Sequence, residues 1–164
     1  MFSAFNFFSD LTQRNLLAQK LGFQCAQVSS LEGFHELLRS ATEVRAMVCV
    51  SDTSTGFTDL INAPRTRRLK TVFMAMRHGE KDEAVRQECF TAMNELFNQF
   101  MSVLLKQKVK LQKDLQYLDS RITFQEIDRF FYTGAACAHF TIAIDTFVDL
   151  TFKPEQWTDG ALPS

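Results

Sequence analysis

The sequence predicts an α+β fold: a mainly antiparallel sheet with one long helix packed across a face and shorter helices near the N-terminus. Three observations lead to this prediction. Two short stretches are apolar on both faces, which is typical of strands inside a sheet. A later stretch alternates between apolar and polar side chains, which is typical of a strand with one covered face. Between them, apolar residues recur at three- and four-residue spacing, which indicates a long amphipathic helix.

The first quarter of the chain predicts two helices separated by a strand. A helix is expected over residues 11–21, with a serine or aspartate cap just before it and Gly22 at its end. The phenylalanine-rich segment 2–8 can extend this helix backwards. A short strand follows over 23–29, and a second capped helix over 31–41.

The central part of the chain predicts two buried strands joined by an arm. Residues 45–51 and 69–76 are apolar on both faces, so both strands should lie inside the sheet. The polar, turn-rich segment 52–67 between them predicts a long loop or a loose hairpin arm, and we expect it to be mobile. The long helix should run from about 81 to 113, a length of roughly 50 Å at about 1.5 Å per residue.

The last third of the chain predicts two more strands and an irregular tail. A strand over 121–129 loses its alternation, which predicts a bulge near Gln125 and Glu126. The clearest strand covers 137–150 and should have one polar face. Residues 152–164 predict an irregular tail that Trp157 can anchor. We therefore expect one domain over residues 1–164.

Composition excludes several classes of protein. The chain is 46% apolar and 23% charged with a net charge of −1, so it is not a disordered chain or a general polyanion binder. Four widely spaced cysteines predict free thiols in a reducing compartment. The N-terminus lacks the basic segment of a signal peptide, and no apolar stretch approaches the ~20 residues of a membrane span. We expect a cytoplasmic protein. The 17 phenylalanines can serve a core or subunit contacts equally well.

No catalytic, metal-binding or cofactor-binding pattern is evident. Cys137 and His139 share a strand face but have no third ligand or orienting acid nearby in the sequence. Asp145 and Asp149 lie roughly 13 Å apart at strand rise, too far for one metal ion. Phosphate-cradling glycine loops are absent. We therefore expect no enzyme activity and no cofactor. A nuclease that uses scattered acids with Lys70 is the weakest of the three functional hypotheses.

Charge is distributed unevenly along the chain. Residues 65–86 hold seven Lys or Arg against three acids, whereas residues 126–164 hold six acids against two bases. Two solvated surfaces would explain this, as would head-to-tail self-assembly or sequence-independent contact with a nucleic-acid backbone. The candidate subunit or nucleic-acid contacts are Arg65, Arg67, Arg68, Lys70, Asp145 and Asp149.

The order of these elements carries a family resemblance. The residues concerned are the strand 47–50, the arm end 64–68, the strand 70–76, the helix 82–105 and the closing strands 122–127 and 140–150. Together they resemble the tail-terminator and neck (tail-completion) proteins of long-tailed bacteriophages. The resemblance implies a small structural protein that assembles into a ring, often sixfold. Such a ring caps or joins a tail tube, contacts other tail or head-completion proteins, and lets DNA pass through its lumen.

Under this resemblance the arm over 52–67 would reach a neighbouring subunit or the tube, and the basic run over 65–70 would line or approach the lumen. The alternative is a cytoplasmic dimeric adaptor or chaperone-like module. That module would bind a partner protein through its sheet or its phenylalanine-rich N-terminus.

Overall fold

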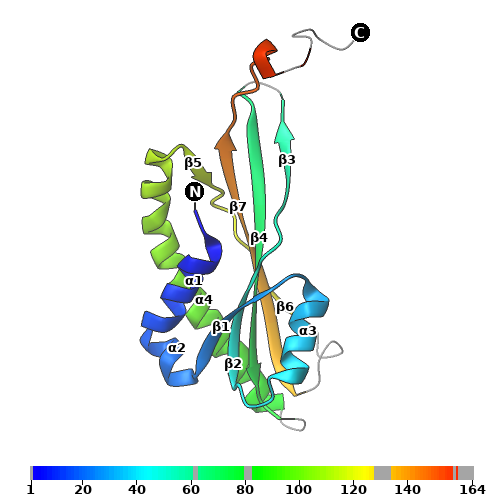
Figure 1. The fold of residues 1–164 in the computed structure, drawn as a ribbon. Helices are drawn as coiled ribbons and strands as arrows, with labels where there is room; N and C mark the ends of the chain where they lie inside the picture. The colour runs from blue at the N-terminus through cyan, green and yellow to red at the C-terminus, as the bar shows by residue number, and fades with distance from the viewer. Residues whose placement is uncertain (1, 61–62, 80–82, 128–133, 157, 159–164) are drawn as a thin grey trace.

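The fold is α+β, as the sequence predicts, with a mostly antiparallel sheet and one long helix (Figure 1). The computed structural model describes residues 2–60, 63–79, 83–127, 134–156 and 158. The helices are α1 (Ala4–Arg14), α2 (Leu16–Leu21), α3 (Leu31–Ser40) and α4 (Glu83–Lys113), with a short 3-10 turn, η1 (Pro154–Gln156). The strands are β1 (Phe23–Val28), β2 (Ala46–Ser51), β3 (Thr55–Asp59), β4 (Arg65–Arg77), β5 (Gln116–Leu118), β6 (Phe124–Ile127) and β7 (Ala135–Phe147).

Two long strands, β4 and β7, form the centre of the sheet. They pair antiparallel along their whole length, from Arg65 opposite Phe147 to Arg77 opposite Ala135. On the outer edge of β4, β2 covers one half and β3 the other, both antiparallel, and β1 adds parallel to β2. On the outer edge of β7, β6 and β5 cover the two halves in the same way. Each central strand therefore has a lower half and an upper half with different neighbours.

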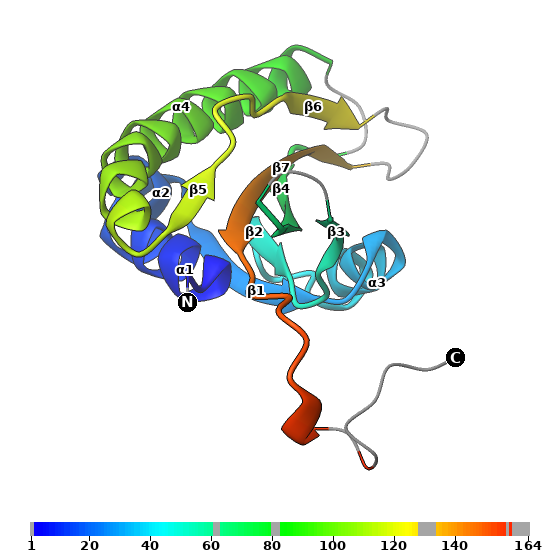
Figure 2. The same ribbon diagram turned by 90° about the horizontal axis from the view of Figure 1, so that it is seen from above.

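The lower half of the sheet is covered on both faces. Even-numbered side chains of β2, β4 and β7, such as Val48 and Met74, form the larger core against α1, α2 and α4. Odd-numbered side chains, such as Cys49 and Phe73, form a smaller core against α3. Figure 2 shows α1, α2 and α4 on the outer side of the curved sheet and α3 on its other side. Both faces are buried, which is why the segments 45–51 and 69–76 carry apolar side chains on both faces.

The N-terminal helix differs from the prediction in its start and its continuity. Helix α1 begins at Ala4, because the Ser3 side chain accepts a hydrogen bond from the amide of Asn6 and caps it. The chain then leaves helical geometry at Asn15, whose side chain accepts from the amide of Ala18 and caps α2. A single helix over 11–21 is therefore wrong, whereas its end at Gly22, with φ of 76°, is confirmed.

The phenylalanine-rich N-terminus belongs to the core. Phe8 is fully buried, with its ring centroid 5.5 Å from that of Phe140 and 6.0 Å from that of Phe100. Phe2, Phe5 and Phe7 pack against the same cluster. These rings anchor α1 across the sheet, so the backward extension of the first helix over the phenylalanine-rich segment is confirmed.

Several boundaries and one irregularity also differ from expectation. Strand β6 pairs with β7 in regular register, so the bulge near Gln125 and Glu126 is wrong. Its alternation slips because Phe124 packs into the larger core and Ile127 into the smaller one. Strand β7 ends at Phe147 instead of 150. The three-residue strand β5 was not predicted, and residues 128–133 and Trp157 lie outside the described part of the chain.

The four cysteines are free thiols, as predicted. Cys49 and Cys137 are buried, and burial raises the pKa of each thiol to about 12. Cys25 is half-buried, with its pKa raised to about 11 for the same reason.

Candidate functional site

The upper half of the sheet projects beyond both cores and forms an arm. We define the arm as β3, the first five residues of β4 (65–69) and the last five residues of β7 (143–147), which pair with one another. Burial in β4 becomes complete only at Val72, where β2 replaces β3 as the neighbour. In Figure 1 the arm rises above α3 and β1. The hairpin expected over 52–67 is therefore present, and its second half is the start of β4.

Strand alternation divides the predicted basic run between the two faces of the arm. Arg65 and Arg67 lie on the face that carries α3 lower down, and Arg68 and Lys70 lie on the face of α1 and α4. The four basic residues are neighbours in the sequence, but two of them lie on each face of the arm and contact different residues. Asp145 lies directly opposite Arg67 on β7.

Arg67 and Asp145 form a paired ion network on the α3 face of the arm. The Arg67 guanidinium donates two hydrogen bonds to the Asp145 carboxylate, from Nε at 2.8 Å and from Nη2 at 3.0 Å. Arg67 Nη2 also lies 3.2 Å from Asp119, and Arg65 lies 4.0 Å from both Asp145 and Asp59. The basic and acidic residues predicted to meet between subunits therefore include two pairs that meet within the chain, Arg67 with Asp145 and Arg65 with Asp145.

The two-pronged contact accounts for the protonation behaviour of this pair. Hydrogen bonds from Arg67 hold the pKa of Asp145 below its usual range, against the opposing effect of burial. The same bonds raise the pKa of Arg67. Because Asp145 is only 8% exposed, water screens this pair less than it screens an open surface pair. Both groups are charged at neutral pH, and their charges largely satisfy each other.

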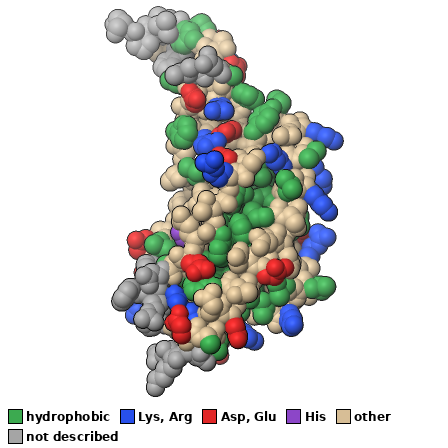
Figure 3. All heavy atoms as spheres, turned by 180° about the vertical axis from the view of Figure 1, so that it is seen from behind, with side chains coloured by type: hydrophobic (Ala, Val, Ile, Leu, Met, Phe, Trp, Pro, Cys, Tyr) green, Lys and Arg blue, Asp and Glu red, His purple; other side chains and the backbone are tan. Residues whose placement is uncertain are grey.

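Exposed aromatic rings flank this network. Phe57 is 59% exposed, Phe147 47% and Tyr117 37%. Tyr117 and Phe147 meet edge to face with centroids 5.5 Å apart, and with Arg65 and Asp145 they line a cavity of about 200 Å³. We call these residues together the arm surface: Phe57, Arg65, Arg67, Tyr117, Asp145 and Phe147. Figure 3 shows acidic and basic side chains side by side on the upper part of the molecule, with apolar side chains next to them.

The remaining predicted residues have other roles. Lys70 donates from Nζ to the carbonyls of Ser51, Asp52 and Thr53, at 3.2, 3.0 and 2.8 Å. All three of its donors are therefore used by the turn between β2 and β3. Asp149 lies after β7, accepts from the amide of Thr151 and pairs with Lys153 at 3.6 Å. Neither residue belongs to the arm surface.

Tyr117 was missed because β5 is only three residues long. Its neighbours Gln116 and Leu118 are buried, while Tyr117 between them is exposed. That alternation is present in the sequence, but a run this short after a basic helix end gives no reliable strand signal. Phe57 and Phe147 were visible as single phenylalanines in polar surroundings, and only the pairing of β3, β4 and β7 brings them to one face.

Cys137 and His139, which share a face of β7, lie in different surroundings: the first is buried and the second is partly buried. The Cys137 thiol is buried with a raised pKa, and burial lowers the pKa of His139. His139 lines an open groove of about 660 Å³ together with Thr71, Phe73 and Thr141. Among the described residues, no group of three or more His, Cys, Asp or Glu side chains lies close enough to hold a metal ion.

Models of known protein families and curated protein sequences were compared with this chain, and neither comparison found a match. Within the described ranges, no helix has the length and apolar character needed to cross a bilayer. The functional argument therefore depends on the arm and its surroundings.

Proposed function

We propose that this protein is a non-enzymatic structural subunit of an oligomeric ring, of the phage tail-terminator or neck type, in which the arm surface contacts the neighbouring subunit. The observation that carries the proposal is the group of three exposed aromatic rings around a fixed Arg–Asp network on a projecting arm. Aromatic residues and arginine supply most of the binding energy in protein interfaces, especially where the surrounding atoms are already ordered.

The arm also offers a strand edge. Strand β3 pairs with β4 on one side, and in the described part of the chain no strand pairs with its other side. An unpaired edge can accept a strand from another molecule through backbone hydrogen bonds. Ring closure needs two different surfaces that meet head to tail, and an arm that reaches away from the core suits one of them.

The phage assignment is supported by the order of elements along the chain, which resembles that of tail-terminator and neck proteins. In such a ring the partners would be identical subunits and other tail or head-completion proteins, with DNA passing through the lumen. Arg65 and Arg67 have carboxylate groups within 4.0 Å, which reduces the charge they offer to phosphates. The arm surface therefore fits contact with protein better than contact with DNA. No cofactor or membrane enters the proposal.

The test is the oligomeric state in solution. We expect light scattering after size exclusion to give a closed oligomer larger than a dimer at tens of micromolar protein, and negative-stain images to show rings. The variant F57S/F147S, which changes two exposed rings, should dissociate to monomers while keeping its helical circular dichroism. L16S is the matched control, because Leu16 is 81% exposed on α2, outside the arm.

Three results would contradict the proposal in whole or in part. A monomer over the whole concentration range would exclude self-assembly, and a concentration-independent dimer would favour the adaptor hypothesis instead. If rings form equally well with F57S/F147S, the ring stands but the arm surface is not its interface. Charge reversal at Arg67 is a poor test, because it also breaks the pair with Asp145 inside the subunit.

A further inference from the structure

The chain beyond β7 has the sequence pattern of a strand. In residues 148–153, which we call the tail segment, apolar and polar side chains alternate: Val148, Leu150 and Phe152 are apolar, and Asp149, Thr151 and Lys153 are polar. Strand β7 nevertheless ends at Phe147, and within the described part of the chain no strand includes the tail segment. Its alternation therefore suits pairing that the single subunit does not provide.

The tail segment starts at the tip of the arm and leads away from it. The amide of Val148 donates to the carbonyl of Pro64 at 3.0 Å, which fixes the start of the segment against the tip. The turn η1, which follows the segment, lies beyond the arm (Figure 1). Leu150 is 51% exposed, and its neighbours Asp149 and Thr151 are exposed too. The segment is thus in a position to reach a second molecule.

Two local contacts hold the tail segment in its present shape. The Asp149 side chain accepts a hydrogen bond from the amide of Thr151 at 3.0 Å and pairs with Lys153 at 3.6 Å. The ion pair is exposed on both sides and contributes little. Pairing with another strand would exchange the bond to Thr151 for one of the same kind, so these contacts oppose a change of partner only weakly.

The outer edge of β3 is the matching acceptor. Strand β3 has five residues, all but the last of them exposed, and the tail segment has six. Because β4 lies between β3 and β7, the tail segment begins roughly 10 Å away from this edge, on the other side of the arm. It would have to reverse and cross the tip of the arm to reach the edge in its own subunit. A tail segment from another copy meets no such obstacle.

The exposed side chains of the two strands match on one face of the arm. Phe57 is 59% exposed and projects from β3 on the side of the arm surface. If Leu150 of the added strand lies beside Phe57, strand alternation brings Val148 to the same face. Apolar contacts would then continue from the tail segment across Phe57 to the other aromatic rings of the arm surface.

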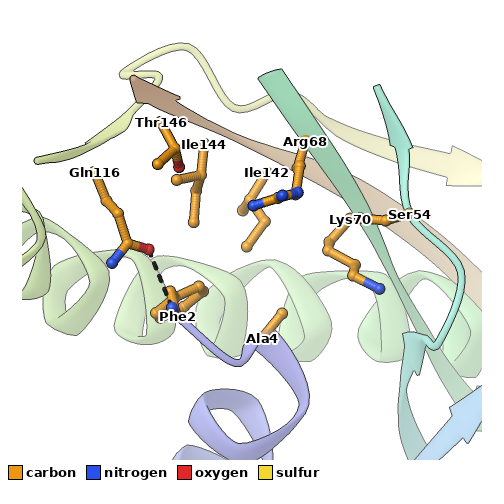
Figure 4. Close-up of a pocket in the computed structure, with 9 residues that line it drawn as sticks. All are labelled: Phe2, Ala4, Ser54, Arg68, Lys70, Gln116, Ile142, Ile144 and Thr146. Carbon is orange, nitrogen blue, oxygen red and sulfur yellow. Dashed lines mark hydrogen bonds between the residues drawn. The ribbon is translucent and has the colours of Figure 1, made fainter. Parts of the chain in front are cut away.

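The opposite face of the arm suits the polar side chains of the added strand. Arg68 and Lys70 lie on this face with Ser54, next to the start of β3, and they border a cavity of about 320 Å³ (Figure 4). An apolar row placed there would take charged groups out of water. Asp149 and Thr151 carry no such cost. The two faces therefore favour the same orientation of the added strand.

We propose that the tail segment of one copy pairs as an additional strand with the outer edge of β3 in the next copy, with Leu150 beside Phe57. The inference rests on the ring proposed above and names the segment that each subunit gives to its neighbour. Donor and acceptor are different surfaces of one chain, as head-to-tail assembly requires. Backbone hydrogen bonds supply the affinity, and the alternate side chains set the register.

The first test compares two double variants of the full chain. L150P/T151P removes two successive amides, one of which must point toward the partner strand, whereas L150T/T151V keeps both amides in residues that favour strands. Light scattering over a dilution series gives the concentration at which half of the oligomer dissociates. We expect L150P/T151P to raise this concentration at least tenfold more than L150T/T151V does. Circular dichroism should stay unchanged in both, since Leu150 is half exposed and Thr151 is exposed.

Hydrogen exchange of the unmodified protein locates the contact. Amides in the tail segment and in β3 should exchange at least tenfold more slowly in the oligomer than in a dilute monomeric sample, because pairing protects both strands. Amides of α3, which lies outside the proposed contact, serve as the control and should exchange equally in the two samples.

The other outcomes overturn the inference. Equal assembly of L150P/T151P and the parent, or equal impairment of the two variants, would show that the tail segment does not act as a strand. Unchanged exchange in β3 while rings form would do the same and leave the ring proposal standing. Protection of the tail segment in the dilute monomer would place the pairing inside one subunit. A protein that stays monomeric would overturn both proposals.

Discussion

Replacing Asp145 with asparagine removes the charge of the arm network while keeping the shape of the side chain. Arg67 loses a two-pronged partner at 2.8 and 3.0 Å, and it retains Asp119 at 3.2 Å. Hydrogen bonds to charged groups contribute roughly 1.5–3 kcal/mol each when the surroundings are partly buried. Because Asp119 compensates in part, we expect the free energy of unfolding to fall by about 2 kcal/mol.

The assay is urea unfolding followed by circular dichroism at neutral pH. With a slope of about 2 kcal/mol per molar urea, a loss of about 2 kcal/mol shifts the midpoint down by about 1 M. The matched control is D10N, because Asp10 and Arg14 form a pair whose side chains are 57% and 77% exposed. An exposed pair of this kind contributes only about 0–1 kcal/mol, so the D10N midpoint should stay within about 0.5 M of the parent.

Acid titration gives the same pair an independent signature. Arg67 holds the pKa of Asp145 in the folded protein below the unfolded value of about 3.9. The stabilisation is therefore complete above that value and is lost as the pH falls through the lowered pKa. The difference in unfolding free energy between the parent and D145N should be constant from about pH 7 to pH 5 and should shrink in more acidic buffer. A D145N midpoint equal to that of the parent at neutral pH would refute the network.

Two further predictions concern the backbone and the thiols. In G56A the added Cβ would lie 2.0 Å from the carbonyl oxygen of Arg67, so β3 must separate from β4. The hydrogen exchange rate of the β3 amides should therefore rise at least tenfold. G33A is the control, because the atom nearest to its added Cβ is 3.7 Å away, and it should leave exchange in β3 unchanged. Cys49 and Cys137 have thiol pKa values of about 12, so at pH 8 a disulfide reagent should modify them only as fast as the protein unfolds; modification within seconds in native buffer would contradict their burial.

The lower half of the fold was predictable because each of its signals is local. An apolar strand such as β2 and the spacing of apolar residues in α4 are each contained in one continuous segment, and both are confirmed with boundaries shifted by a residue or two. The backward extension of α1 was visible for the same reason. The break at Asn15 was not, because asparagine within a helix and asparagine as a cap look alike in a sequence.

The arm could be predicted only in part because its character depends on pairing. A hairpin over 52–67 was expected from turn residues, but the sequence does not say that Arg67 lies opposite Asp145 or that Phe57, Tyr117 and Phe147 share one face. Their separations along the chain exceed any local pattern. Counting charges over 65–86 and 126–164 could not show that Arg67 and Asp145 pair inside the subunit, and the predicted attraction between subunits stays a prediction.

Lys70 shows how a predicted contact residue can instead be a structural one, and K70M separates the two roles. Its ammonium group donates to three carbonyls of the turn that leads from β2 into β3. Methionine keeps the length and the apolar stem but leaves those carbonyls to water, which costs about 1–2 kcal/mol of stability since the turn is mostly exposed.

Urea unfolding and hydrogen exchange of β3 should therefore both change in K70M under conditions that keep the protein monomeric. K20M is the control, because Lys20 is exposed on α2, away from the turn. If K70M unfolds like the parent and only its assembly is impaired, Lys70 acts between subunits and the three carbonyl contacts contribute nothing measurable. If monomer stability falls first, any loss of assembly follows from a loosened arm, and the contact role returns to the aromatic residues on the other face.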